Sequence, residues 1–499
     1  MEYTSQYKQL SLETFRSSLE SLPKDNRWVQ LGDQLPWDKI ERIYNARLNN
    51  EYRGAGNKPA RLIIGAVIIK HKMNLSDEET IETIRENPYM QYMLGLSEFT
   101  DLPVFDPSLF VTIRKRLGSN DFNNMSEELL KTQIAQQEKQ QEAQQETKKD
   151  NENGTDSKSS DLADKEIKSP NKGLLKVDAT CADAEVRYPT DLDLLHDGLR
   201  IMDRIIYMLY KCLKKAKPDT KYSESRSAYL NVIKLRSKPR KRVRQCKGVL
   251  LKSLYDNIMQ AIEAIAKSTS DLFYKLRLYY QRLFITIIKM YHQQKEMYDA
   301  RQHSCKDRII SIFQPHVRPI VRGKAKAKVE FGAKIGASIV DGYTFVDHHS
   351  WDAYNECEDL LVHLRKYKIR FGCLPAKFEG DKIYMNRRNR RILKFLGIEI
   401  GGKPLGRPSK EQDAKEYRKK MAKNIGERNE IEATFGTGKR VYRANNIRAK
   451  LPNTGESWTS MCYFAKNVMK FLRELLHVLF NILLLYRFFP QGIRFLRML

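Results

Sequence analysis

The stretch that decides the fold is Val329 to Val346, which reads VEFGAKIGASIVDGYTFV. It contains two runs of β-forming residues joined by Asp341-Gly342, and Asp-Gly between such runs is among the strongest short signals for a β-hairpin. Other strand-like runs occur at 173–180, 373–384 and 397–400. We therefore expect a mixed sheet that includes this hairpin.

The segments between and after these strands have helical patterns. Helices are predicted at Asp352 to Lys366, at Asn386 to Leu396 and from about Ser409 to Phe435. A last helix, Tyr463 to Phe489, carries an apolar stripe, which is typical of a helix that docks on the protein or on a second copy. The predicted fold class is therefore mixed α and β.

The N-terminal region has signals only for helices. Ser76 and Glu79 have the spacing of a capping box that opens a helix at Asp77, and Pro88 is expected to break or kink that helix. A second helix is predicted from Leu109 to Leu117, ended by Gly118. We expect a compact helical domain that either binds DNA or dimerises; the simpler alternative is a packing domain.

Two segments interrupt the chain between this region and the hairpin. From about Gln136 to Lys172 large apolar residues almost disappear, which predicts a disordered linker. Between Leu192 and Tyr298 apolar residues recur every three or four positions, which predicts about three amphipathic helices inserted into the core.

The charge points to a polyanionic partner. The 499 residues contain 89 Lys and Arg against 61 Asp and Glu, a net charge of +28. Such a surplus favours nucleic acid, with an acidic membrane surface as the weaker alternative. The longest apolar stretch, Leu475 to Tyr486, is shorter than the roughly 20 residues that a spanning helix needs, so we expect no membrane association. Seven cysteines without a CxxC pair indicate a reducing compartment, the cytosol.

Basic residues gather at several places that could contact phosphates. The run Lys234 to Lys247 has eight Lys or Arg and no acid, and it is either a phosphate-contacting loop or a solvated one. Arg428, Glu432 and Lys439 fall on one stripe of a predicted helix. The candidate DNA contacts are Arg114, Arg116, Arg240, Lys241, Arg242, Arg244, Arg387, Arg388, Arg428, Lys439 and Arg440.

Three acids stand where separate elements could converge. Asp178 is predicted at the end of the first strand, Asp381 at the end of the fourth and Glu432 on the late helix. Carboxylate oxygens are the ligands that Mg²⁺ or Mn²⁺ prefers. The pattern alone leaves rivals open, because Glu379 shares a strand face with Asp381, Asp183 lies near Asp178, and Glu430 lies two residues before Glu432 on another side of the helix.

Ordered motifs along the chain resemble the DDE transposases of bacterial insertion sequences, InsH type. The motifs are NLSDEET at 74–80, FDPSLFVTIRKRLG at 105–118, KVDAT at 176–180, RYPTD at 187–191, QPHVRPI at 314–320, WDAYNE at 351–356, GDKIY at 380–384 and RNEIE at 428–432. The resemblance covers nearly the whole chain.

This resemblance implies a ribonuclease-H-like catalytic core, interrupted by the helical insertion, whose catalytic and metal-binding acids are Asp178, Asp381 and Glu432. It implies two Mg²⁺ or Mn²⁺ ions and a transposase that cleaves DNA at the inverted repeats of its element and joins the ends to target DNA. The implied partners are double-stranded DNA and further copies of the chain, as a homodimer or higher oligomer, in a bacterial cytoplasm and on the nucleoid when DNA is bound. The alternatives are a catalytically idle DNA-binding derivative and a nuclease without joining activity.

We expect the chain to be organised in six segments. It comprises the helical domain at 1–118, a helix end and linker at 119–172, the first core strand and its loop at 173–191, the helical insertion at 192–312, the remainder of the core at 313–450 and a helical tail at 451–499.

Overall fold

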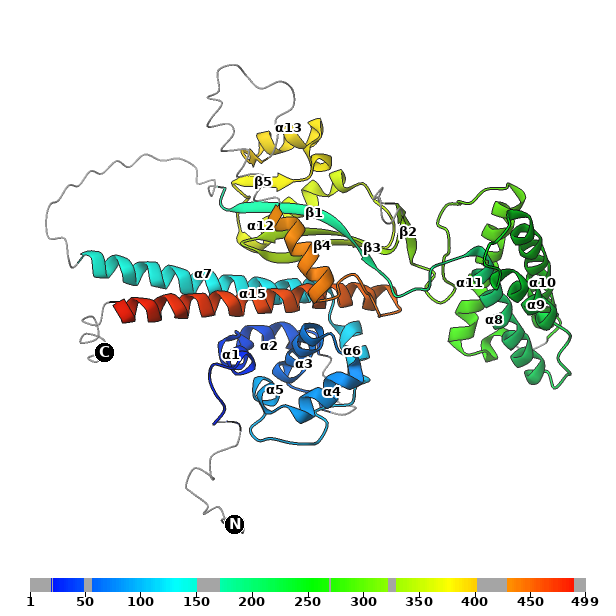
Figure 1. Ribbon diagram of the computed structural model, residues 1–499, viewed down its shortest axis with the longest axis horizontal. Coiled ribbons are helices and arrows are strands. Elements are labelled where there is room, and N and C mark those ends of the chain that lie inside the picture. Colours follow the sequence, from blue (N-terminus) through cyan, green and yellow to red (C-terminus); the bar gives the residue numbers. More distant parts are fainter. Residues whose placement is uncertain are drawn as a thin grey trace, which may run out of the picture.

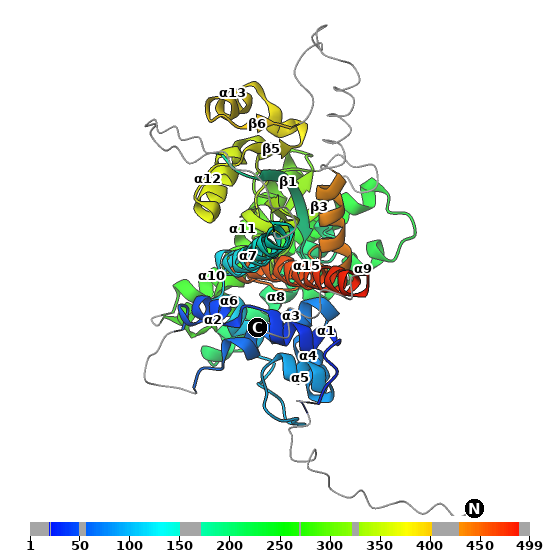
Figure 2. The ribbon, with the colours of Figure 1, turned by 90° about the vertical axis from the view of Figure 1, so that its left-hand side faces the viewer.

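The computed structural model describes residues 19, 21–48, 56–149, 171–268, 271–321, 329–401 and 429–488. Figure 1 shows a mixed sheet with short helices beside it, a long pair of helices, α7 and α15, next to the sheet, N-terminal helices on the far side of that pair, and a separate bundle of helices, α8 to α11. Figure 2 shows the same order from the side, with the long pair between the N-terminal helices and the sheet.

The N-terminal domain is helical, as predicted. Both halves of the capping box form, since the Glu79 N–H donates to Ser76 Oγ at 3.1 Å and the Ser76 N–H donates to Glu79 Oε2 at 2.7 Å. Pro88 breaks the predicted helix in two, with Asn87 capping the second part. The helices are α1 (Arg27–Gln34), α2 (Trp37–Asn45), α3 (Ala60–Met73), α4 (Asp77–Glu86), α5 (Pro88–Met93) and α6 (Leu109–Arg116).

The sheet is mixed, and the predicted hairpin forms one side of it. Strand β1 pairs antiparallel with β3 and parallel with β5, and β5 pairs parallel with β6. Strands β2 and β4 both pair antiparallel with the same side of β3, one after the other along its length. The strands are β1 (Leu174–Asp183), β2 (Arg318–Val321), β3 (Val329–Val340), β4 (Tyr343–Ser350), β5 (Lys377–Gly380) and β6 (Glu399–Ile400).

The hairpin turn has the backbone that its sequence predicts. Asp341 and Gly342 both have positive φ, 47° and 75°, which matches the twist of the flanking strands. A Cβ on Gly342 would also lie 2.6 Å from Lys470 Cε, so a side chain there would collide as well as strain the turn.

The helices after the hairpin are shorter than predicted. The helix expected from Asp352 begins only at Leu360, because a 3-10 turn (Glu356–Asp359), in which the Asn355 side chain accepts from the Cys357 N–H, comes first. Helix α12 is Leu360–Phe371, and α13 (Arg387–Phe395) confirms the next prediction. The polar helix predicted from Ser409 lies largely in 402–428, outside the described residues, and a helix is present at 429–441.

The predicted linker was wrong in its first part. Helix α7 spans Ser119–Lys149, so residues 136–149 are helical, and residues 150–170 lie outside the described part. Gln, Glu, Lys and Ala are good helix formers, and the segment continues a helix whose earlier turns are anchored by buried Phe122, Met125 and Leu130. Helix α15 spans Pro452–Phe488 and also begins earlier than predicted.

Helices α7 and α15 close the open edge of the sheet. Asn123 of α7 donates to the Val346 carbonyl at 2.7 Å and accepts from the Val346 N–H at 3.1 Å. Asn467 of α15 makes the same two bonds with Thr344, at 2.7 and 2.9 Å. Both amides therefore make the hydrogen bonds that a neighbouring strand would make with β4. Without them, the backbone groups of Thr344 and Val346 would be buried without partners.

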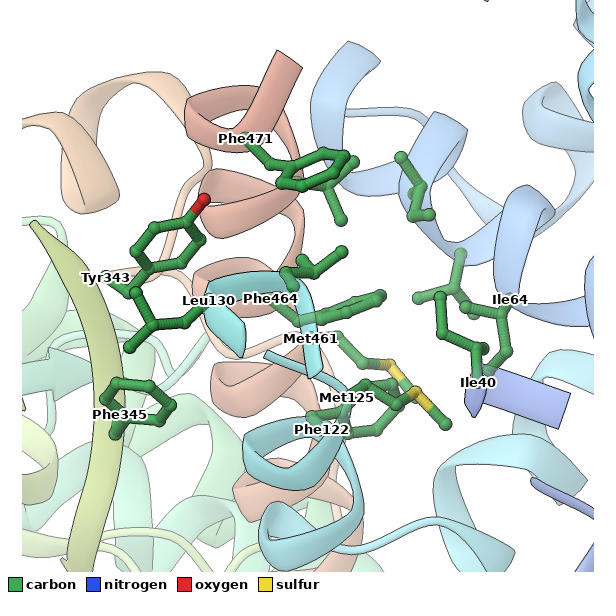
Figure 3. Close-up of a cluster of buried hydrophobic side chains, with 14 of the residues drawn as sticks. Ile40, Ile64, Phe122, Met125, Leu130, Tyr343, Phe345, Met461, Phe464 and Phe471 are labelled. Atoms are coloured by element: carbon green, nitrogen blue, oxygen red, sulfur yellow. The ribbon is translucent and has the colours of Figure 1, made fainter. Parts of the chain in front are cut away.

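One apolar cluster joins the sheet, the helix pair and the N-terminal domain. Figure 3 shows Phe345 of β4, Phe122 of α7, Phe464 of α15 and Ile40 and Ile64 of the N-terminal helices in this cluster, and all five are buried. Phe122 and Phe464 have ring centroids 5.7 Å apart. The docking interpretation of the last helix is therefore confirmed up to residue 476, where the description of its side chains ends.

The insertion is a separate helical bundle with its own core. It has four long helices, one more than the approximate prediction: α8 (Asp191–Cys212), α9 (Tyr222–Ile233), α10 (Arg240–Ala266) and α11 (Leu278–Asp299). The Asp191 carboxylate accepts hydrogen bonds from Lys247 of α10 at 3.0 Å, from Gln294 of α11 at 3.1 Å and from Arg308 at 2.8 Å. These bonds link three parts of the bundle to the start of α8. None of the helices within the described ranges has the length and apolar character needed to cross a membrane.

We predict that Asn123→Ala lowers the free energy of unfolding by about 2–4 kcal/mol, because it leaves two buried backbone groups of Val346 without partners. Urea unfolding followed by circular dichroism measures the loss. The exposed neighbour Asn124 is the matched control, and Asn124→Ala should change stability by less than about 0.5 kcal/mol. Equal effects of the two substitutions would contradict the edge-closing role.

A second prediction concerns pH. His71 of α3 is buried edge-on against Trp458 of α15, with ring centroids 5.1 Å apart, and burial together with the cations Lys70 and Arg114 lowers its pKa to about 3. In the unfolded chain the imidazole has a pKa of about 6.5, so below that pH the unfolded state binds a proton that the folded state does not bind. The free energy of unfolding therefore falls as the pH drops below 6.5, by about 2 kcal/mol at about pH 5. Unfolding of the parent and of His71→Gln at neutral pH and at pH 5 tests this, and the variant should lose about 2 kcal/mol less.

Candidate active site

The register of the sheet brings two of the three predicted acids side by side. Val177 of β1 pairs with Gly380 of β5, and Asp178 and Asp381 are the next residues on these parallel neighbours. Parallel neighbours at the same level point to the same face of a sheet. Asp178 lies in the middle of β1 instead of at its end, because the strand continues to Asp183 along the long strand β3.

Backbone N–H groups orient both carboxylates. Asp178 Oδ1 accepts from the Ala179 N–H at 2.8 Å, and Asp381 Oδ1 accepts from the Lys382 N–H at 2.7 Å as the cap of a 3-10 turn (Lys382–Met385). Both side chains are half-buried. These bonds fix the orientation of the two carboxylates.

The helix 429–441 lies over the same face of the sheet. Its residues Ile431 and Phe435 are buried in a cluster with Ala337, the partner of Asp178 on β3. Glu430 forms an ion pair with Lys176, which lies two residues before Asp178 and so on the same face. Glu432, on the same helix, is exposed.

Asp178 and Asp381 therefore lie on one face, and Glu432 lies exposed on the helix that covers this face, but the three acids do not form a tight group. Among the described residues, three potential ligand atoms lie within 4.8 Å of one another at Cys181, Asp183 and Glu330, and not at Asp178, Asp381 and Glu432. Asp183 and Cys181 are an odd number of residues from Asp178, so they point to the opposite face. Burial and the neighbouring carboxylates raise the pKa of Cys181 to about 12, which keeps the thiol protonated.

Two rivals of the predicted acids are engaged in ion pairs. The buried carboxylate of Glu379 lies 2.6 Å from Lys377 Nζ. Glu430 is paired with Lys176, as described. Sequence reasoning missed Lys176, although its spacing of two from Asp178 in a strand gives it the same face and a basic side chain in a buried strand is unusual.

The predicted DNA contacts fall into three groups. Arg114 is a correction: its side chain is buried and makes two hydrogen bonds to Asp77, at 3.0 and 2.7 Å, so it serves packing. Arg116 is half-buried beside the Tyr44 hydroxyl, and Lys439 is half-buried. The exposed ones are Arg240, Lys241, Arg242, Arg244, Arg387, Arg388 and Arg440; Arg428 lies outside the described residues.

The basic run 234–247 is largely helical, contrary to the predicted loop. Pro239 precedes the first turn of α10, which contains Arg240, Lys241 and Arg242. Arg244 stacks on the Tyr298 ring at 4.2 Å and donates to the Tyr298 carbonyl at 3.0 Å, while Lys247 is buried against Asp191. The exposed cations therefore sit on a rigid helix end.

Comparisons with known proteins match both ends of the chain. Residues 16–116 match the family Transposase domain (DUF772), and residues 379–469 match the family Transposase DDE domain. The first range is the N-terminal helical domain, and the second contains Asp381, Glu432 and the first half of α15.

A curated relative is similar to part of the chain. The "Uncharacterized protein ORF8 in nfe locus" of Rhizobium meliloti is 32% identical over 126 residues, which are 24% of this chain and 56% of the relative. The chain thus spans about half the length of this relative. No solved structure matches the chain significantly. The chain is thus similar to transposase domains over residues 16–116 and 379–469, the second of DDE type, in agreement with the resemblance of its ordered motifs.

Proposed function

We propose that this chain binds the terminal inverted repeats of its own insertion sequence, cleaves the DNA at those ends and joins them to target DNA by in-line phosphoryl transfer. The observation that carries the proposal is the pairing of β1 with β5, which sets Asp178 beside Asp381 on the face that the helix of Glu432 covers. A DNA-cleaving site needs carboxylates from separate elements on one face, and this arrangement supplies them.

The strand order supports a ribonuclease-H-like core. Three antiparallel strands, β4, β3 and β1, are followed across the sheet by two strands parallel to β1, namely β5 and β6. The helical insertion leaves after β1 and returns before β2. Such a core would bring its acids together from the first strand, the fourth strand and a late helix, as the resemblance implied.

The donors fit hard divalent cations. Asp178, Asp381 and Glu432 offer only oxygen, which suits Mg²⁺ or Mn²⁺, and Asp178 and Asp381 already accept backbone N–H bonds that fix their orientation. We propose that these three residues hold two such ions, which when bound stabilise the attacking and leaving oxygens of the displacement.

The remaining residues of the face would position the DNA and the helix. The ion pair of Lys176 with Glu430, together with buried Ile431 and Phe435, holds the helix 429–441 against the sheet. Arg387 and Arg388, exposed on α13 a few residues after Asp381, would contact phosphates of the flanking strand. Exposed Arg440 would do the same from the helix end.

DNA is also bound away from the acids in this proposal. The exposed cations of the first turn of α10 lie on the separate insertion, where they can reach DNA beyond the cleaved position. The N-terminal domain would bind or pair the ends, and two or more copies would hold the two ends of one element together. The rivals are an idle DNA-binding derivative, which would bind without cutting, and a nuclease, which would cut without joining.

We predict that Asp178→Asn, Asp381→Asn and Glu432→Gln each reduce cleavage of labelled end DNA at least about a hundredfold while end binding persists, because each removes a metal ligand and not a phosphate contact. Glu430→Gln is the comparison for the third acid: it breaks the ion pair with Lys176 and should reduce cleavage much less than Glu432→Gln. Strand cleavage and joining with Mg²⁺, scored on sequencing gels, measure the effect. If Glu430→Gln is inactive and Glu432→Gln is active, the assignment of the third acid is wrong.

Arginine variants separate DNA contact from packing. Arg388→Ala should lower the steepness of the plot of log binding constant against log salt by about 0.9 and leave stability unchanged, since one phosphate contact is lost. Arg114→Ala should instead cost roughly 3 kcal/mol of stability, because it leaves Asp77 with Lys70 as its remaining basic partner. Fluorescence anisotropy over a salt series and urea unfolding measure the two effects; an unchanged salt dependence in Arg388→Ala would exclude that contact.

A further inference from the structure

A cavity of about 560 Å³ lies between the start of α7 and one face of α12, beside the end of α2. Its volume falls in the range of roughly 300–1,000 Å³ that is usual for small-ligand sites. Three parts of the fold meet here: Arg47 follows α2 of the N-terminal domain, Asn120 lies in the first turn of α7, and Arg365 and Lys366 lie on α12 of the core. None of these residues belongs to the acids or to the DNA contacts described above.

The cavity is on the other side of the sheet from the candidate acids. Arg370 of α12 donates to Ser338 Oγ of β3 at 3.1 Å, and Ser338 is the partner of Val177 on β1. Val177 and Asp178 are consecutive strand residues, so their side chains point to opposite faces. Helix α12 therefore covers the face that Asp178 does not use, and a ligand in this cavity is not the phosphate on which the acids would act.

Cations dominate the wall of the cavity. It contains Arg47, Arg365, Lys366 and Arg370 against a single acid, Glu127. The Glu127 carboxylate already lies 2.7 Å from the amine of a lysine one turn further along α7, Lys131. The wall therefore has an excess of positive charge.

Two of the four cations have carboxylate partners and two do not. Arg47 Nε lies 2.9 Å from Asp121 Oδ1, and Arg370 forms an ion pair with the buried carboxylate of Asp347. Within the part of the chain that the structure describes, Arg365 and Lys366 form no ion pair. These two side chains are therefore available to an anion from outside the chain.

The environment of Lys366 favours such an anion. Its side chain is half-buried, and this burial lowers the pKa of its amine because desolvation disfavours the charged form. Lys366 Nζ donates to Asn120 Oδ1 at 3.2 Å, which leaves Asn120 Nδ2 to act as a donor. An anion between the two side chains would supply the countercharge that Lys366 lacks and would accept from the amide.

We propose that this cavity binds a phosphate group, and that the phosphate links the N-terminal domain to the core. Lys366, Arg365 and the Asn120 amide donate to its oxygens, and Arg47 contacts it from the N-terminal domain. The phosphate belongs to a DNA backbone or to a small phosphorylated compound, since both present the same oxygens to these donors. Neither source requires the cleavage reaction proposed above.

The test measures binding of inorganic pyrophosphate to the full chain by isothermal titration calorimetry without divalent metal ions. We expect a dissociation constant below about 1 mM. Lys366→Met and Arg365→Met should each weaken binding at least about tenfold, because each removes a charge-assisted hydrogen bond. Arg365 is exposed, so its variant tests the site even if Lys366→Met does not fold.

Lys368→Met is the matched control. It removes the same charge from an exposed position of α12 outside the cavity, and at physiological salt it should change the dissociation constant less than about twofold. Absence of pyrophosphate binding, or equal weakening by Lys366→Met and Lys368→Met, would overturn the phosphate site whether or not the chain cleaves DNA. A chain that binds pyrophosphate here but never cuts its ends would overturn the proposed function alone.

A competition titration separates the two sources of the phosphate. If the source is DNA, a duplex of arbitrary sequence displaces pyrophosphate, and Lys366→Met lowers the steepness of the plot of log DNA-binding constant against log salt by about 0.9. If the source is a small compound, the duplex and pyrophosphate bind at the same time and the steepness is unchanged. Either result supports the phosphate site and identifies its ligand.

Discussion

The free edge of β4 is the constraint on which the rest of the arrangement depends. A strand edge inside a protein has backbone N–H and C=O groups that must find partners, and here they are provided by the amides of Asn123 and Asn467. These amides come from two helices far apart in sequence. The sheet can therefore be complete only when α7 and α15 lie together beside it.

This requirement connects the N-terminal domain to the acids. Helix α7 follows directly after α6, and α15 follows the helix 429–441 that lies over Asp178. Ser457 and Ser460 of α15 bond to Leu117 and Ser119 at the start of α7, at 2.7 and 2.9 Å. A domain proposed to hold DNA ends is thus anchored to the same helix pair that completes the sheet.

Much of the fold could be predicted because its signals are local. The hairpin turn, the capping box at Ser76 and the break at Pro88 each depend on a few adjacent residues. The helical nature of 136–149 could not be predicted from apolar content, since it rests on helix propensity and on an anchor in the preceding turns. The burial of Arg114 depends on Asp77, which is distant in the sequence.

The candidate site was predictable in its residues and only partly in its geometry. Spacing and motif resemblance named Asp178 and Asp381, and the register between β1 and β5 makes them neighbours. Their pairing could not be read from the sequence, because the insertion separates the two strands and register depends on long-range contacts. For the same reason nothing in the sequence indicates that Asn120 and Lys366 border one cavity.

Iron-directed cleavage of the polypeptide shows most directly where the chain holds a divalent ion. Fe²⁺ can replace Mg²⁺ and, with ascorbate and peroxide, cuts the polypeptide next to the site that binds it; mass spectrometry then maps the cuts. We predict cuts near Asp178, Asp381 and Glu432, and their loss when excess Mg²⁺ is added. Cuts confined to the neighbourhood of Cys181, Asp183 and Glu330 would contradict it.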